Sequence, residues 1–180
     1  LMSKIGKINI SIPEKVKVVL NGNLLNIEGP LGKKTLNMDL NIFDLKINDG
    51  KELSIKPKTI NKETKRLWGM NRSLLNNAII GANTGYNKVL ELSGVGFRAA
   101  LKGKTLNLQL GFSHDINFEI PETVKIVVEK QTIIKITGSD KQEVGMIASK
   151  IKSLKPPEPY KGKGIKEQGQ YILRKEGKKK

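Results

Sequence analysis

The residues of this sequence that could support catalysis lack the partners that catalysis needs. Gly103-Lys104-Thr105 resembles the end of a phosphate-binding loop, but Arg98 stands where such a loop needs a Gly. Gly94-Val95-Gly96 lacks the third Gly of a dinucleotide-binding turn and the helix that should follow it. We therefore interpret the first segment as a hairpin turn and the second as a bulge or tight turn.

The single histidine, His114, gives no stronger case for an enzyme. The chain has no cysteine, so a metal site at His114 would need carboxylates around it, and no such spacing is visible. A general base would also need a partner nucleophile, which is not evident. Glu14 and Glu122 occupy the same position of an internal repeat and are interpreted as strand-start residues. We expect no enzyme activity, no cofactor and no metal, and we expect His114 to cap a turn or to contact a phosphate.

The segment from Pro156 to Ile165 has the most distinctive chemistry. Its sequence, PPEPYKGKGI, combines three prolines, which favour an extended chain, with two glycines that alternate with two lysines. Glycine lets a backbone come close to a partner, and Lys161 and Lys163 can contact phosphates. A flexible basic linker is the alternative, but Tyr160 and the prolines are unusual in a spacer.

The charge of the chain favours a polyanionic partner, and nucleic acid is the first candidate. The 180 residues include 33 Lys and Arg against 17 Asp and Glu, which gives a net charge of +16. Residues 141–180 hold 12 of the basic and four of the acidic residues, so this short part carries half of the excess. The binding surface is predicted at the C-terminal end. Eight aromatic residues are too few for an extended base-stacking platform.

Two other function classes remain as alternatives. A small enzyme acting on a phosphate-bearing substrate would need acid, base or metal groups that converge in one pocket. A membrane-surface protein would need lysines along an amphipathic helix with aromatic anchors, and no apolar run approaches the ~20 residues of a membrane span. The absence of cysteine fits a reducing compartment, and the first residues lack a secretory or transit pattern.

An internal repeat organises the chain. Ile12–Val19 recurs as Ile120–Val127 with six identical pairs. The similarity resumes after a one-residue insertion, where Leu24, Leu25, Ile27 and Gly29 correspond to Ile133, Ile134, Ile136 and Gly138. A helix follows in each copy, with Trp68–Ser73 corresponding to Val144–Ser149. Two copies indicate duplicated domains and not a solenoid.

The hydrophobic periodicity predicts one helix in each copy. The first should run from Asn61 or Lys62 to about Ile80, with Leu67, Met70, Leu74 and Ala78 on its apolar face. The second should begin at a capping box formed by Ser139 and Gln142 and should stop at Pro156. Segments of alternating or β-branched residues predict strands at residues 16–20, 24–28, 33–38, 52–56, 88–92, 97–101, 106–110, 124–128 and 133–137.

These elements predict an α+β fold of two duplicated small domains. Each domain should be an antiparallel-rich sheet with one helix packed on a face, and a basic extended C-terminal tail should follow. We expect the first domain at residues 1–82, the second at 83–155 and the tail at 156–180. Because the tail is mostly Pro, Gly and Lys, it should bury little apolar surface and contribute little to the stability of the free protein.

Five segments carry a resemblance to a known family. They are Ser3–Lys7, Glu28–Gly32, Leu92–Ala99, Leu110–His114 and Glu158–Ile165. In order and separation they resemble the recurring segments of the large-subunit ribosomal protein six family, bacterial or organellar type, over nearly the whole chain. Phe97 stands where a Tyr is common in that family.

The resemblance implies a structural constituent of the large ribosomal subunit that binds large-subunit ribosomal RNA near the sarcin–ricin loop and the stalk base. Neighbouring ribosomal proteins and translation factors would lie nearby, and no membrane would be involved. The implied location is the cytoplasmic ribosome of a bacterium, with the ribosome of the mitochondrial matrix or the plastid stroma as the alternative. The expected RNA-contact residues are Lys155, Tyr160, Lys161, Gly162, Lys163, Gly164, Lys166, Arg174, Lys175, Lys178, Lys179 and Lys180, with Arg98 and His114 added.

Overall fold

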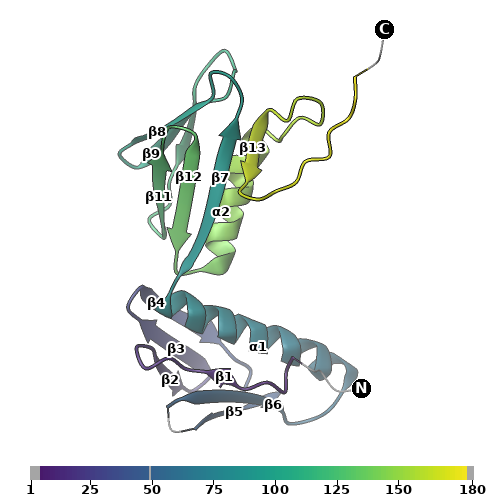
Figure 1. Cartoon of the computed structure of the whole chain (residues 1–180). Coiled ribbons are helices and arrows are strands. Elements are labelled where there is room, and N and C mark those ends of the chain that lie inside the picture. Colours follow the sequence, from purple (N-terminus) through teal and green to yellow (C-terminus); the bar gives the residue numbers. More distant parts are fainter. Residues whose placement is uncertain (1–4, 49, 178–180) are drawn as a thin grey trace. The chain divides into compact units, whose positions relative to one another are not determined.

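The computed structural model describes residues 5–48 and 50–177 and has an α+β fold (Figure 1). The chain divides into two compact units. Unit 1 contains the chain up to Gly85 together with Ser139–Lys141, and unit 2 contains Tyr86–Gly138 and the chain from Gln142 onward. Each unit has antiparallel sheets and one main helix, so the predicted α+β class with one helix in each half is confirmed.

Unit 1 contains two three-stranded antiparallel sheets, in the orders β1-β6-β5 and β2-β3-β4. Its helix α1 packs against β3, β4 and β6. The elements are β1 (Ile10–Ser11), β2 (Lys17–Asn21), β3 (Leu24–Gly29), β4 (Gly32–Asn37), β5 (Phe43–Asn48), β6 (Glu52–Pro57) and α1 (Lys62–Asn83).

The buried face of α1 differs from the predicted one. Of the predicted residues, Ala78 is buried and Leu67 is partly buried against the core, whereas Met70 and Leu74 are exposed. The face that contacts the sheets contains Thr64, Trp68, Leu75, Ala78, Ile79, Gly81 and Ala82. Apolar residues occur on both sides of this helix, so periodicity alone did not separate the core side from the solvent side.

Unit 2 contains a three-stranded sheet, β10-β9-β8, and a four-stranded sheet, β11-β12-β7-β13. Leu90, Leu106, Leu108, Ile134 and Ile151 are fully buried in one core between sheets and helix. The elements are β7 (Tyr86–Ser93), β8 (Arg98–Lys102), β9 (Thr105–Gln109), β10 (Ile116–Glu119), β11 (Val124–Glu129), β12 (Ile133–Gly138), α2 (Lys141–Leu154) and β13 (Gly164–Glu167).

The repeat in the sequence corresponds to a repeat in strand pairing. In unit 1, Lys17 of β2 pairs with Glu28 of β3, and in unit 2 the corresponding Lys125 of β11 pairs with Thr137 of β12. The register is therefore the same in both copies.

The predicted tail is partly a strand of the second unit. Gly164–Glu167 forms β13, which pairs with β7 in the four-stranded sheet (Figure 1), and Ile165 is fully buried in the core of unit 2. The expectation that this segment buries little apolar surface is wrong for Ile165. A strand of four residues with one inward apolar side chain gives too weak a periodic signal to detect.

Candidate nucleic-acid interface

A shallow groove in unit 2 brings together three segments that are far apart in the sequence. The groove has a volume of about 520 Å³. Val95 and Phe97 come from the loop between β7 and β8, Leu110 and Gly111 follow β9, and the third side comes from the chain after α2. That third side consists of Lys155, Pro156, Glu158 and Lys163. The three segments are those that carry the family resemblance in the second half of the chain.

Phe97 fixes the two loops of the groove. Its ring is buried, and a Cβ atom added to Gly94 would lie 3.0 Å from this ring. A Cβ atom on Gly111 would lie 3.3 Å from the same ring, and both glycines have positive φ angles. Glycine is required at both positions because the loops close tightly around Phe97. Val95 is left at the loop tip with 94% of its surface exposed.

Lys155 and His114 come together through Phe112. The Lys155 Nζ lies 4.6 Å from the centroid of the Phe112 ring, which is a cation–π geometry. The Phe112 and His114 rings stack with centroids 6.5 Å apart. Two of the predicted site residues are thus placed beside an aromatic ring that sequence reasoning did not select. The sequence around Phe112 does not predict its contacts with Lys155 and His114, because the exposure of the Phe112 ring depends on the fold of the loop.

The segment Glu158–Lys163 forms a turn and not the extended chain that its prolines predicted. The Glu158 N–H donates to the Lys163 carbonyl oxygen at 2.8 Å, and the Gly162 N–H donates to the Glu158 carbonyl oxygen at 2.9 Å. Gly162 has a φ of +71°. The turn leaves the side chains of Tyr160, Lys161 and Lys163 exposed.

Gly162 and Gly164 are both buried, and packing within the chain requires glycine at Gly164. A Cβ atom on Gly164 would lie 2.6 Å from the carbonyl oxygen of Pro156. Gly164 also has a φ of +145°, which an L side chain rarely adopts. The sequence predicted that both glycines allow close approach to RNA, and the structure shows that Gly164 closely approaches the chain's own backbone.

The chain after β13 passes beside the turn at Glu158–Lys163, and its basic residues contact that turn. The Lys175 N–H donates to the Pro159 carbonyl oxygen at 2.9 Å, and the Arg174 guanidinium lies 3.5 Å from the Cβ position of Gly162. Arg98 is exposed at the start of β8, directly after Phe97, and does not line the groove. Lys178, Lys179 and Lys180 lie outside the described residues.

One set of lysines in unit 2 forms ion pairs around β13. Lys166 pairs with Glu91 at 3.1 Å, and Glu167 accepts from Lys88 at 2.7 Å and from Lys152 at 3.3 Å. The hydrogen bond from Lys88 is the main cause that holds the pKa of Glu167 below its ordinary value of 4.5, and the bond from Lys152 adds to it against the opposing effect of burial. These lysines brace β13, so Lys166, a predicted RNA contact, is already paired.

The other predicted cations have no such partner. No ion pair within residues 5–48 and 50–177 involves any member of this set, which contains Arg98, Lys155, Lys161, Lys163, Arg174 and Lys175. Their charge is therefore available for an external anion.

Among the described residues, no group of three or more His, Cys, Asp or Glu side chains could hold a metal ion. No helix in this part of the chain is long and apolar enough to cross a membrane.

Comparison with known proteins identifies the family. Residues 93–168 match the family model described as Ribosomal protein L6. The chain is 45% identical over 179 residues to "Large ribosomal subunit protein uL6" of Sphingopyxis alaskensis, which covers 99% of this chain and 100% of the relative. The protein of the same name from Parvibaculum lavamentivorans is 46% identical over 180 residues, with the same coverage. The chain belongs to the ribosomal protein L6 family.

L6 family membership confirms the resemblance read from the five segments. It also agrees with the expectation that the chain is not an enzyme, since its relatives are named as ribosomal proteins. The matched region, 93–168, begins beside Gly94 and ends directly after β13. It contains every residue that lines the groove.

Proposed function

We propose that this L6-family chain is a structural constituent of the large ribosomal subunit and binds large-subunit ribosomal RNA through the groove of unit 2 and the turn beside it. The convergence of three separate family-like segments with cations that lack ion-pair partners supports this proposal. The lysines around β13, in contrast, are held in ion pairs with Glu91 and Glu167.

The mechanism is neutralisation of phosphates combined with recognition of RNA shape. Lysine and arginine side chains that contact phosphates release bound counterions, which gives affinity without base specificity. The rigid loops around Phe97 and the turn at Glu158–Lys163 present those charges in a fixed arrangement, as recognition of a folded RNA requires. Tyr160 and Phe112 are both partly exposed and can stack at most one or two bases.

The proposal also includes the region of the ribosomal RNA that the protein binds. The family resemblance supports a site near the sarcin–ricin loop and the stalk base, beside neighbouring ribosomal proteins and the region where translation factors bind. The relatives named above come from bacteria, which supports a bacterial ribosome in the cytoplasm over a mitochondrial or plastid one.

The salt dependence of RNA binding tests the mechanism. The full chain and a Lys161→Gln/Lys163→Gln variant are titrated with a large-subunit RNA fragment that carries the sarcin–ricin loop and the stalk base. Affinity decreases with salt, so the slope of log affinity against log salt is negative. If both lysines contact phosphates, the magnitude of this slope is smaller by about 1.4 to 1.8 in the variant, because each contact contributes roughly 0.7 to 0.9. A Lys102→Gln/Lys125→Gln variant, which removes two exposed lysines elsewhere in unit 2, should keep the slope.

Two results would contradict the proposal. An unchanged slope in the Lys161→Gln/Lys163→Gln variant would exclude the turn as the phosphate-binding element. Hydroxyl-radical footprints of the bound protein that fall outside the sarcin–ricin loop and the stalk base would exclude the proposed place of binding.

A further inference from the structure

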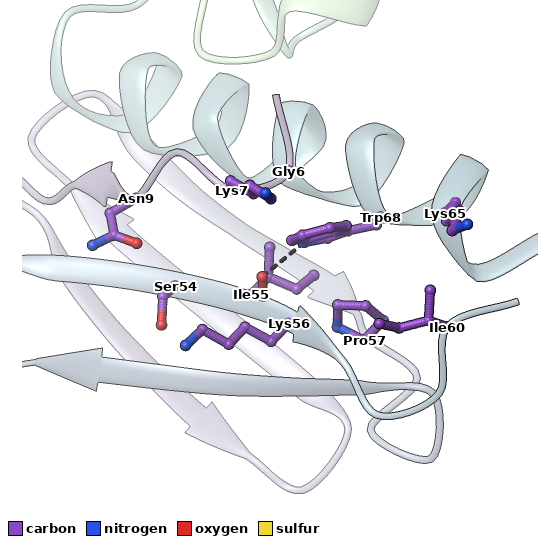
Figure 2. A pocket seen from close by; sticks show the side chains of 10 residues that line it. All are labelled: Gly6, Lys7, Asn9, Ser54, Ile55, Lys56, Pro57, Ile60, Lys65 and Trp68. Atoms are coloured by element: carbon purple, nitrogen blue, oxygen red, sulfur yellow. Dashed lines mark hydrogen bonds between the residues drawn. The ribbon is translucent and has the colours of Figure 1, made fainter. Parts of the chain in front are cut away.

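Unit 1 contains a cavity that the proposed RNA-binding role does not use. It has a volume of about 290 Å³ and lies between the segment Gly6–Asn9, strand β6 and the first turns of α1 (Figure 2). The residues that line it are Gly6, Lys7, Asn9, Ser54, Ile55, Lys56, Pro57, Ile60, Lys65 and Trp68.

The wall formed by Trp68 is preformed and rigid. The Trp68 Nε1–H donates to the carbonyl oxygen of Ile55 at 2.7 Å, and Figure 2 shows this bond between α1 and β6. Gly6 lies against the indole so closely that a Cβ atom there would be 2.5 Å from the ring. The Arg72 Nε–H donates to the Ile8 carbonyl oxygen at 3.2 Å, which ties the N-terminal segment to α1.

The cavity combines an apolar interior with a positive rim. Ile55, Pro57 and Ile60 supply aliphatic surface, and Ile60 is largely exposed. Lys7, Lys56 and Lys65 supply three positive charges, and none of them forms an ion pair in the part of the chain that the structure describes. The Asn9 side-chain amide donates to the Glu52 carboxylate at 3.0 Å.

The geometry argues against a nucleic-acid occupant. Base stacking needs an open aromatic face, but Trp68 is only 6% exposed and Gly6 covers its ring. The volume lies at the lower end of the roughly 300 to 1,000 Å³ that small-molecule sites occupy, so it has room for one or two side chains. An apolar side chain flanked by carboxylates complements both the interior and the rim.

We infer that this cavity docks a short acidic segment of another protein, with one aliphatic or aromatic side chain inserted beside Trp68 and carboxylates placed on Lys7, Lys56 and Lys65. This interaction would act in addition to RNA binding, because every residue that carries it belongs to unit 1.

Trp68 is the only tryptophan in the chain, so its indole N–H signal in a ¹⁵N NMR spectrum reports on this cavity alone. The full chain is titrated with the synthetic peptide EDLFED. The Trp68 indole signal should shift and saturate. The peptides QNLFQN and EDSSED should each bind about tenfold more weakly or less, because the first lacks the charges and the second lacks the apolar anchors.

Matched variants assign the interaction to the rim. Lys56→Glu/Lys65→Glu should weaken EDLFED binding by about tenfold, since each exposed ion pair contributes a factor of roughly three to five. Lys15→Glu/Lys17→Glu makes the same change of charge at exposed lysines of unit 1 outside the cavity and should bind as the parent protein does.

Three outcomes would overturn the inference. They are an indole signal that EDLFED does not move, unchanged binding by the Lys56→Glu/Lys65→Glu variant, and an equal or stronger shift with hexauridylate RNA, which would make the cavity a nucleic-acid site. Each is independent of the RNA-binding proposal, which depends on residues of unit 2.

Discussion

The two units share a repeat but complete their sheets in different ways. In unit 1, β3 lies between β2 and β4, and β4 follows it directly in the sequence. In unit 2, the corresponding strand β12 lies between β11 and β7, and the free side of β7 is covered by β13, which comes after α2. The duplicated pair of strands therefore accepts different neighbours. Only the second copy draws the C-terminal segment into its sheet.

This difference places the charges of the two units in different settings. In unit 2, β13 follows directly on the turn at Glu158–Lys163, so the exposed lysines of that turn are held against a folded sheet. In unit 1, three lysines surround an apolar cavity next to Trp68. The comparison teaches that the common core supplies stability, whereas the elements added around each copy distinguish the surfaces available for binding.

Deletion of residues 156–180 is the strongest test of this comparison. It removes β13 and Ile165, opens the edge of β7 and exposes the core beside it. We expect a loss of at least about 5 kcal/mol, which is comparable to the whole stability of a small domain, so unit 2 should unfold. The helical circular dichroism signal should fall, while Trp68 fluorescence should stay native because the core of unit 1 contains no residue from the deleted segment.

The opposite result would support the prediction from composition that residues 156–180 form a tail that contributes little to stability. If the shortened chain unfolded at the same temperature as the full chain by circular dichroism, residues 156–180 would be an appended tail. If Trp68 fluorescence also changed, the two units would not fold independently.

A single substitution separates the contribution of Ile165 from that of the backbone. Ile165→Ala removes a fully buried side chain and should destabilise unit 2 by about 2 to 5 kcal/mol. Leu173→Ala, in the same C-terminal segment, removes a side chain that is 71% exposed and should change stability by less than about 0.5 kcal/mol. Chemical denaturation followed by circular dichroism measures both, and equal effects would show that Ile165 is not a core residue.

Most of the fold could be predicted from local pattern. The repeated strands Lys17–Asn21 and Val124–Glu129 and both helices have enough periodic residues to be recognised. The buried face of α1 was missed because Met70 and Leu74 are exposed apolar residues. The strands β1, β5, β10 and β13 were also missed, and β1, β10 and β13 have four residues or fewer. The helix face and the short strands depend on what packs against them, and a local pattern does not contain that information.

The candidate site, like the fold, could be predicted only in part from the sequence. The exposed Lys161 and Lys163 were selected by composition and motif. The sequence did not show that Lys166 is paired with Glu91 or that Phe112 lies under Lys155, because these contacts join segments that are distant in the chain. Residue type could therefore be predicted, and the pairing of residues could not.

Gly29 and Gly138 occupy the same position of the repeat, so substitution of each glycine compares the two units directly. A Cβ atom on Gly29 would lie 2.4 Å from the backbone oxygen of Ala82, and one on Gly138 would lie 2.9 Å from a side-chain methyl of Val144. Overpacking costs about 1 to 3 kcal/mol, and helix backbone yields less than a methyl group. Gly29→Ala should therefore destabilise unit 1 more than Gly138→Ala destabilises unit 2. Thermal unfolding of both variants checks the order, and the reverse order would contradict the expectation that the helix backbone at Ala82 yields less than the Val144 methyl group.

The smallest expected effects concern two carboxylates with lowered pKa values, and the larger of the two effects is that of Glu167, which holds β13. The pKa of Glu167 is lowered chiefly by the hydrogen bond from Lys88, so its charged form is favoured by folding. The stability that it contributes is complete above its ordinary pKa of 4.5 and is lost as pH falls through the lower pKa of the folded state. Glu167→Gln should therefore destabilise unit 2 at pH 7 by at most about 1 kcal/mol, since the pairs are partly exposed and screened by salt. The difference from the parent chain should shrink as pH falls below 4.5.

In unit 1, the pKa of Glu28 is also lowered, mainly by its hydrogen bond from Lys33, but both partners are well exposed. Glu28→Gln should therefore have a smaller effect than Glu167→Gln, with the same direction of pH dependence. Urea denaturation at pH 7, 5 and 3 in low and high salt measures both variants. An effect of Glu167→Gln that stayed constant down to pH 3 would show that the residue stabilises β13 through packing and not through its charge.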